Sequence, residues 1–560
     1  MTNSCTENRV TRRMGVLIAI TLLAGTRIAF AGNDAADEAS ATIRPEAIRA
    51  DMRFLADDLL EGRGTGTRGH EIAAKFMASE FEAMGLDPAG DNGSYFQSVP
   101  LRAIEPDKER TILSLWRGGK ELVLIFGQDF ISLVDPGRTE VSVEAPVVYV
   151  GFGITAAEQS YDDYAGMDAK AKIVAFVSGA PPQFEPTMRA HYSSGAMKAA
   201  NAAAHGAVGA MVLDSPAMEQ IHPFKERVSD LAFPDMRWLD TKGQPNDYFP
   251  ELRGAVFLSM EATAGVFQGS GKSPEEIFAA AKLGKPSSMA LPVAAKIKTV
   301  SKFRDLRSPN VVARVTGSDP ILRDEYVVYT AHLDHLGIGQ PVNGDRIYNG
   351  ALDNASGSAC LLEIARAYSK MQPRPRRSIL FVSVTAEEAG LLGSDYFARY
   401  PTVPKNSLIA DINIDGNLAL LWPIEDVIAR GSEHSTLSIA VREAAARLRL
   451  DVSPDPFREL VFFIRSDQYS FVKQGIPSVF PSAGTKSSDP NIKPQQIITK
   501  WRQTTYHKPQ DDMNQPFDFE SGAKYARYNF FLGYLVAQKT EKPAWNPGDF
   551  FGEHYAKKAN

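Results

Sequence analysis

The chain has 560 residues, a length that exceeds one ordinary domain core and predicts two or three lobes. Hydrophobic residues make up 44% and charged residues 23% of the sequence, as in soluble globular proteins. The net charge of −6 excludes the basic footprint of a nucleic-acid-binding protein, so we expect no nucleic-acid partner.

The first part of the chain has the layout of a secretory signal peptide. Three arginines precede an apolar run at residues 14–25, and Ala29-Phe30-Ala31 supplies small residues for cleavage before Gly32. The apolar run is shorter than the roughly 20 residues that span a membrane. We therefore expect residues 1–31 to be a signal peptide. The mature protein is expected to be exported, either periplasmic or secreted, and to contain no membrane segment.

Residues 32–140 are predicted to be the N-terminal part of the main domain. Apolar positions at helical spacing predict one helix over residues 47–60 and a second over residues 70–84. A glycine-rich break at residues 62–66 separates them, and the segment 95–135 contains strand-like runs.

Residues 141–295 are predicted to form an inserted, smaller α/β lobe. The apolar runs at 145–153, 172–178 and 207–213 have strand character, and an alanine-rich helix is expected at 196–205. This segment contains none of the charged clusters described below.

Residues 296–560 show a regular alternation of apolar strands and helices. The expected strands are 325–331, 378–385, 408–414 and 476–480, and the expected helices are 355–370, 391–400, 435–448 and 521–538. Near-continuous apolar strands alternating with helices indicate an α/β fold with a mainly parallel central sheet and helices on both faces. Within the first of these helices, Cys360 is expected to pack as a small buried residue and not to act as a catalytic thiol.

Histidine and carboxylate residues follow these strands, where open α/β sheets form their sites. The candidates are His332, Asp334, Asp353, Glu387, Glu388, Asp415 and His507. Taken singly, each has an ordinary explanation, such as a helix cap or a solvated surface charge. Together they would bring several carboxylates to one place, and metal ions neutralise such a concentration of charge.

Five of these residues make a neutral site with two Zn²⁺ per chain. Asp353, Glu388 and Asp415 carry three negative charges, a bridging hydroxide carries a fourth, and His332 and His507 are neutral. If Asp353 bridges, one ion takes His332 and Asp415, and the other takes Glu388 and His507. Each ion then has the four ligands that zinc favours. Two metal ions about 3.5–4 Å apart activate the shared water and polarise a carbonyl group.

Two neighbouring carboxylates are left for other roles. Glu387 adjoins a ligand without being one, which suits a general base that moves the proton of the water to the leaving amine. Asp334 lies two residues after His332. On an extended segment its carboxylate would share a side with the imidazole, accept its second N–H and fix its tautomer.

These motifs resemble the co-catalytic zinc aminopeptidases, a family that includes bacterial leucyl aminopeptidases and glutamate carboxypeptidase II. The likeness extends to residues 60–69 (LEGRGTGTRG) and 465–471 (RSDQYSF) and so covers nearly all of the mature chain. It implies the ligand set argued above and suggests that Tyr506 donates to the carbonyl oxygen in the transition state. The 141–295 insertion is similar to the protease-associated domain that many members carry.

The chain departs from the family pattern at two places. Members often have Ser-Asp-His where this chain has Ser466-Asp467-Gln468, which puts a pocket role of that segment in doubt. Gly416 follows Asp415 where Met is common, which leaves Asp411 as an alternative ligand.

The sequence thus predicts a metallo-aminopeptidase. It would be an exported, zinc-dependent exopeptidase that hydrolyses peptides with a free N-terminus, with a metal-bridging hydroxide and Glu387 as the base. Three alternatives stay open: a glutaminyl cyclase-like acyl transferase with one zinc, a catalytically silent binding protein of the same fold, and a carboxypeptidase or dipeptidase. The sequence fixes neither the specificity pocket nor the oligomeric state.

Overall fold

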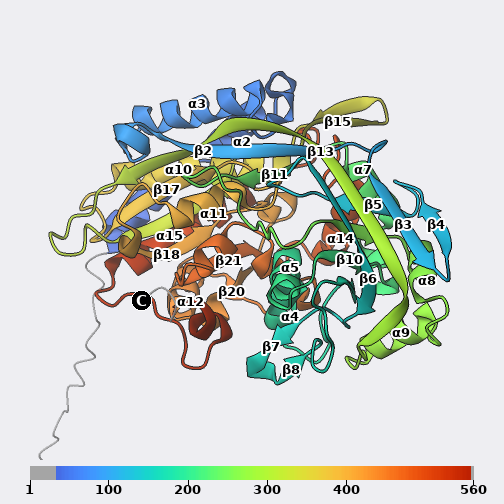
Figure 1. Cartoon of the computed structure of the whole chain (residues 1–560). Helices are drawn as coiled ribbons and strands as arrows, with labels where there is room; N and C mark the ends of the chain where they lie inside the picture. Colours follow the sequence, from blue (N-terminus) through green and yellow to red (C-terminus); the bar gives the residue numbers. More distant parts are fainter. Residues whose placement is uncertain (1–32, 557–560) are drawn as a thin grey trace, which may run out of the picture.

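The computed structural model describes residues 33–556, and these form two lobes, each built on its own sheet (Figure 1). The two sheets share one long strand, β13 (Met289–Val315). The predicted signal peptide at residues 1–31 lies outside the described residues. None of the described helices combines the length and the apolar character that crossing a membrane requires.

Four parallel strands form the centre of the larger sheet. Their spatial order is β17 (Ser378–Val384), β14 (Tyr326–His332), β18 (Leu408–Asn413) and β21 (Ser478–Ala483). Every residue of these strands is buried, because both faces of the sheet are covered. The predicted α/β fold with a parallel central sheet is therefore confirmed.

Antiparallel strands flank this parallel centre. On one side β13 pairs with β17 and with β2 (Phe96–Pro106), and β11 (Asp235–Trp238) pairs with β2. On the other side β19 (Asp426–Arg430) is antiparallel to β21 and carries the short strand β20 (Asp451–Val452). The two-residue strand β1 (Asp87–Pro88) also pairs with β13.

Helices cover both faces of the larger sheet. One face carries the main core and the helices α1 (Asn33–Ala41), α2 (Pro45–Leu55), α3 (Arg68–Ala83), α10 (Ser356–Lys370), α12 (Leu437–Arg447), α14 (Pro494–Thr504) and α15 (Phe519–Gln538). The other face carries α11 (Leu392–Arg399) and α13 (Gln468–Val472).

Side-chain caps fix where several of these helices begin. Thr67 accepts a hydrogen bond from the main chain of His70 at the start of α3, and Asp518 does the same for Ser521 at the start of α15. Within α10, Cys360 is fully buried, as expected for a packing residue.

The smaller lobe has a mixed sheet with its own core. Its parallel strands are β6 (Glu140–Tyr149), β9 (Ile173–Val177), β10 (Gly209–Leu213) and β12 (Ala255–Leu258). Three strands that precede residue 141 also belong to this sheet, namely β3 (Ile112–Arg117), β4 (Lys120–Leu124) and β5 (Phe130–Leu133). The smaller lobe is therefore larger than the expected 141–295 insertion.

Short helices and two hairpins complete the structure. The helices of the smaller lobe are α4 (Pro186–Ser193), α5 (Gly195–Ala204), α6 (Pro216–Ile221), α7 (Phe224–Asp230), α8 (Met260–Phe267) and α9 (Pro274–Lys282). The hairpins are β7 (Thr155–Ala156) with β8 (Tyr161–Asp162), and β15 (Gly337–Val342) with β16 (Asp345–Tyr348).

Candidate metal centre

The five predicted metal ligands converge at the carboxyl ends of the parallel strands. His332 is the last residue of β14, Glu388 follows β17, and Asp415 follows β18. Asp353 precedes α10, and His507 lies in the loop after α14. The strands thus fix three of the positions, and two connecting segments supply the others.

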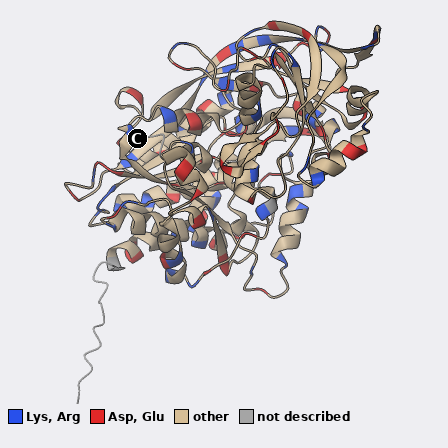
Figure 2. Ribbon diagram, turned by 60° about the horizontal axis from the view of Figure 1, so that its bottom comes forward, with Lys and Arg blue, Asp and Glu red and all other residues tan. Residues whose placement is uncertain are grey.

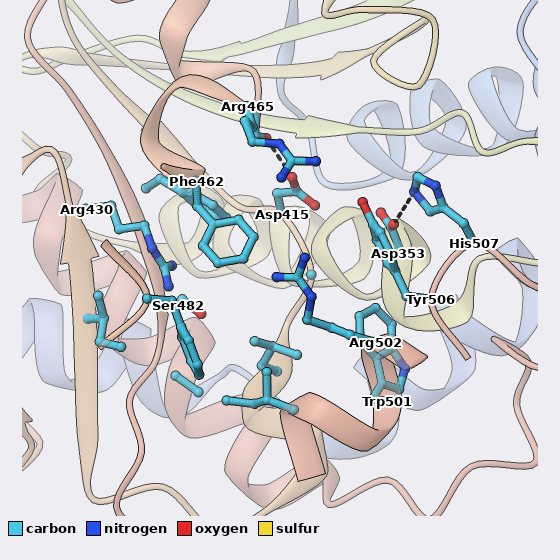
Figure 3. Close-up of a pocket in the computed structure, with 18 of the residues that line it drawn as sticks. Asp353, Asp415, Arg430, Phe462, Arg465, Ser482, Trp501, Arg502, Tyr506 and His507 are labelled. Carbon is cyan, nitrogen blue, oxygen red and sulfur yellow. Dashed lines mark hydrogen bonds and ion pairs between the residues drawn. The ribbon is translucent and has the colours of Figure 1, made fainter. Parts of the chain in front are cut away.

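Asp353 lies between the two histidines. Its Oδ1 atom is 3.2 Å from His332 Nε2, and its Oδ2 atom is 3.3 Å from His507 Nε2. Asp415 Oδ1 lies 3.2 Å from the same atom of His332, and Glu388 Oε2 lies 3.2 Å from the same atom of His507. Figure 3 shows Asp353 beside His507, with a dashed line that joins the two side chains. The five side chains therefore form two groups that share Asp353.

The separations between histidine nitrogen and carboxylate oxygen fit the ligand spacing of zinc. Zinc bonds to nitrogen and oxygen are about 2.0–2.2 Å long, so neighbouring ligand atoms of a tetrahedron lie about 3.3–3.6 Å apart. The observed separations of 3.2–3.3 Å are close to the lower bound. Imidazole nitrogen and carboxylate oxygen are also donor atoms that zinc takes.

The electrostatics of the cluster favour a bound cation. Burial opposes a charged imidazole, yet Glu387 and Asp415 raise the pKa of His332 well above its ordinary value. Burial is likewise outweighed at His507, where Glu388 and Asp353 raise the pKa to about 10. The carboxylates that hold a proton on these histidines would attract a metal ion in the same way.

Glu387 lies beside both groups without forming one of the ion pairs. Its carboxylate approaches His332 and Glu388, with one atom of each of the three lying within 4.8 Å of the others. Burial and the charge of Glu388 raise the pKa of Glu387 well above its ordinary value, although His332 opposes the shift. The side chain also lines the cavity next to the cluster. Glu387 is thus a free carboxylate at the place where a proton would have to be moved.

The prediction for the Asp334 side chain is wrong. His332 Nδ1 lies 3.0 Å from the main-chain oxygen of Asp334, not from its carboxylate. That carboxylate instead accepts hydrogen bonds from the main-chain N–H groups of Glu387 (3.1 Å) and Glu388 (3.3 Å) and from the hydroxyl of Thr65 (3.0 Å). Strand β14 ends at His332, so the alternation of an extended segment does not continue to Asp334. Asp334 therefore holds the loop that carries Glu387 and Glu388.

His335 is a site residue that the sequence analysis did not single out. It is buried, and its Nδ1 atom lies 2.6 Å from Glu388 Oε1, the oxygen that does not face His507. His335, Asp353 and Glu388 together bring ligand atoms within 4.8 Å of one another. The available signal was a second histidine three residues after His332 in the same strand-end segment.

Arg63 was also missed, although its motif was noted. The side chain is fully buried and donates hydrogen bonds to the main-chain oxygens of Leu333 (2.9 Å), Asn349 (2.6 Å) and Gly350 (3.0 Å), and also to that of Leu55. It therefore ties together the segments that carry His332 and Asp353. The signal was an arginine between glycines in a break between two helices.

Two further side chains orient the carboxylate ligands. Asp511 accepts hydrogen bonds from the main-chain N–H groups of Leu352 (3.0 Å) and Asp353 (2.9 Å). Ser466 donates a hydrogen bond of 2.6 Å to Asp415 Oδ2. Ser466 belongs to the Ser466-Asp467-Gln468 segment, which departs from the family pattern, and this segment thus contacts a predicted ligand through its serine.

Asp411, the alternative ligand, does not contact the histidines of the cluster. It is buried inside β18 and accepts a hydrogen bond of 2.9 Å from the Thr330 hydroxyl. Asp415, four residues later, is the carboxylate that reaches His332. Gln468 is also buried and structural, since its amide donates to the main chain of Phe463.

A cavity of about 140 Å³ opens next to the cluster, and its lining includes Glu387 and Tyr506. Figure 3 shows Tyr506 next to Asp353. The Tyr506 ring stacks on the His507 ring, with 3.8 Å between their centroids. Burial and the charges of Asp353 and Glu388 raise the pKa of Tyr506 well above its ordinary value. The phenol therefore stays protonated and can donate a hydrogen bond into the cavity.

Comparison with known proteins matches the part of the chain that contains the site to a described family. Residues 310–528 match the family model described as peptidase family M28, and this segment contains all five predicted ligands. A probable glutamate carboxypeptidase of Arthroderma benhamiae is 33% identical over 146 residues, which are 25% of this chain and 18% of that protein. The aminopeptidase NAALADL1 of Mus musculus is 35% identical over 133 residues, which are 22% of this chain and 16% of that protein. The chain thus spans less than a fifth of the length of either relative.

A solved structure resembles the chain over most of its length. The aminopeptidase from Aneurinibacillus sp. strain AM-1 aligns with 92% of this chain and 99% of its own, with a TM-score of 0.53 and 19% sequence identity. At this level of identity the likeness shows a shared fold.

Proposed function

We propose that this chain, whose residues 310–528 match peptidase family M28, is a zinc-dependent exopeptidase that removes residues from the N-terminus of peptides. The observation that carries the proposal is the pair of ligand groups that share Asp353, each with atoms 3.2–3.3 Å apart. Acidic and basic residues are interspersed over the described chain (Figure 2), in keeping with a peptide substrate and not with nucleic acid.

The ligand groups assign five residues to two ions. His332 and Asp415 would hold one zinc ion, Glu388 and His507 the other, and Asp353 would bridge them. His335 faces the second oxygen of Glu388 and would orient that ligand from outside. When bound, the two ions would supply an activated water molecule and a polarised substrate carbonyl group.

The residues around the ions have separate tasks. Glu387 would take the proton of the attacking water and deliver it to the nitrogen of the leaving amine. Tyr506, which stays protonated, would donate its hydroxyl hydrogen to the oxygen of the reacting carbonyl. Asp334 contacts neither water nor substrate in this scheme. It fixes the main chain of Glu387 and Glu388, so it is a positioning residue.

Metal analysis combined with peptide assays tests this function. The purified protein should contain about two zinc ions per chain, lose activity to a chelator and regain it with zinc. One ion per chain would favour the cyclase chemistry, and none would favour a binding protein. The names of the relatives mention both carboxypeptidase and aminopeptidase, so the assay should compare substrates blocked at either terminus.

Export is a separate proposal that rests on the N-terminal sequence. The arginines, the apolar run and the small residues before Gly32 support cleavage at that point and a periplasmic or secreted protein. Mass spectrometry of the protein from its native cells should find an N-terminus near Gly32. A mature protein that starts at Met1 and stays in the cytosol would refute export without affecting the zinc site.

A further inference from the structure

Three arginines line the cavity beside the metal centre, and we refer to Arg430, Arg465 and Arg502 as the arginine wall. The remainder of the cavity away from the ligands is largely apolar, with Ile428, Phe457, Phe462, Phe480, Ala483 and Ile498 among its lining residues. Charged groups in apolar surroundings are costly unless they are paired, so each guanidinium group of this cavity is expected to have a counter-charge.

The charge of Arg430 is balanced within the protein. Its Nε atom lies 2.7 Å from Asp455 Oδ2, and its guanidinium carbon lies 5.0 Å from the centre of the Phe462 ring. This ion pair and the ring contact leave Arg430 as a structural part of the wall.

Arg502 has no such partner. Its guanidinium carbon lies 4.8 Å from the same Phe462 ring, and the group is half-buried. Across residues 33–556, no carboxylate forms an ion pair or hydrogen bond with it. Burial lowers the pKa of Arg502, and the positive charges of Arg465 and Arg430 lower it further against the effect of Tyr506. Within the described residues, Arg502 is therefore a half-buried cation near two other arginines and without an ion-pair partner.

Arg465 completes the wall at the more exposed rim of the cavity. Within the described part of the chain its side chain also forms no ion pair. In Figure 3 the guanidinium groups of Arg465 and Arg502 approach the space beside Asp415 from opposite sides. The mutual electrostatic effect of the two arginines agrees with this proximity.

The metal centre does not use up these positive charges. Four carboxylates line the cavity, those of Asp353, Glu387, Glu388 and Asp415. Under the proposed function, these carboxylates and the bridging hydroxide carry five negative charges, and the two zinc ions carry four positive charges. The one negative charge left over balances at most one of Arg465 and Arg502, so a positive charge remains for a ligand, and a carboxylate is the group that a guanidinium fork binds most specifically.

We propose that Arg465 and Arg502 form a subsite for a carboxylate of the substrate, so that the enzyme prefers acidic peptides. This inference rests on the proposed function. The carboxylate has one of two sources. It is either the side chain of an N-terminal Glu or Asp, whose methylene groups would contact the apolar lining of the cavity, or the C-terminus of a short peptide.

The test compares substrates that differ in one charge, using the zinc-loaded enzyme. Glu-4-nitroanilide and Gln-4-nitroanilide have the same shape and no terminal carboxylate, whereas Leu-Leu and Leu-Leu-amide differ only at the C-terminus. Charge-assisted hydrogen bonds predict a kcat/KM ratio of about tenfold or more in favour of the acidic member of one pair. The pair that shows this ratio identifies the source of the carboxylate.

Substitutions then assign the preference to the wall. Arg502→Gln and Arg465→Gln should each reduce the ratio toward one, and Arg502→Lys should restore part of it because the charge returns. Arg442→Gln, at an exposed position of α12, is the matched control and should leave the ratio unchanged. Zinc content and circular dichroism verify that each variant is folded.

Two outcomes would overturn the inference. One is the absence of any preference in both pairs, and the other is a preference that survives both glutamine substitutions. In either case cleavage of Leu-4-nitroanilide would still support the proposed function. If the zinc-loaded wild type cleaved none of the substrates, the proposed function itself would fail.

Discussion

The adjacent residues Glu387 and Glu388 provide a sharp test of the site, because the structure gives them different tasks. Both have main-chain N–H groups bonded to the Asp334 carboxylate, so replacing either side chain leaves that anchor in place. Only Glu388 forms the ion pair with His507, with 3.2 Å between Oε2 and Nε2. Exchanging each glutamate for glutamine therefore separates metal binding from proton transfer.

Glu387→Gln should reduce kcat while both zinc ions stay bound. Glutamine keeps the size of the side chain but cannot take the proton of the water. General-base catalysis typically contributes about 10²–10⁴-fold, so kcat should fall by at least the lower figure. This corresponds to about 3–5 kcal/mol of transition-state free energy. KM should change little, because the lost interaction acts in the transition state.

Glu388→Gln should instead weaken one zinc site. It removes a negative ligand, so the affinity should fall by more than the roughly 10–100-fold that changes to outer-sphere partners cause. Zinc titration and steady-state kinetics on both variants decide the matter, with Glu251→Gln at an exposed position as the control. The reasoning is refuted if Glu387→Gln loses zinc while Glu388→Gln keeps two ions, or if Glu387→Gln turns over normally.

Three further predictions concern groups outside this pair. His507→Ala should lose one zinc ion, whereas His335→Ala should keep two with weaker binding; equal loss in both variants would make His335 a ligand. Arg63→Met should lower the free energy of unfolding by more than about 3 kcal/mol, since four buried main-chain oxygens lose their donor, and an unchanged urea midpoint would contradict this. Burial and the charges of Glu80 and Glu363 raise the pKa of Asp51 to about 7, so folding favours its protonated form and stability falls as pH rises from about 4 to 7. Asp51→Asn should therefore raise the melting temperature at pH 8 but not at pH 4, and an equal shift at both values would exclude this cause.

The sequence predicted best where local pattern and strand topology agree. Continuous apolar runs identified β14, β17 and β18, and the carboxyl ends of parallel strands then brought His332, Glu388 and Asp415 together. The strand expected at 476–480 was observed at Ser478–Ala483, so its bounds were less certain than its existence. The site could be anticipated because its chemistry follows directly from these strand ends.

The sequence could not predict contacts that depend on distant parts of the chain. Arg63 acts through main-chain oxygens that lie about the metal site, and Asp511 acts through the N–H groups of Leu352 and Asp353. Every residue has these main-chain groups, so the sequence does not show which of them a side chain will contact. Asp334 was misjudged because the turn after β14 redirected its carboxylate.

The boundary of the smaller lobe was hidden for the same reason. β3 and β5 look like ordinary strands of the main domain until their partners are known, and those partners are β13 and β12. Only the pairing of strands reveals to which sheet each one belongs.

The strand shared by the two sheets has a mechanical consequence. β13 pairs with β6 up to Val300 and with β2 from Ser301 onward, so the polypeptide passes between the lobes without a loop. β13 is paired on both sides of this crossing, so swinging the smaller lobe about it would strain main-chain hydrogen bonds to β6 and to β2. The smaller lobe is thus attached through a strand of the larger sheet. Excising it would cut β13, which pairs with β17, and β17 in turn pairs with β14, the strand that ends in His332.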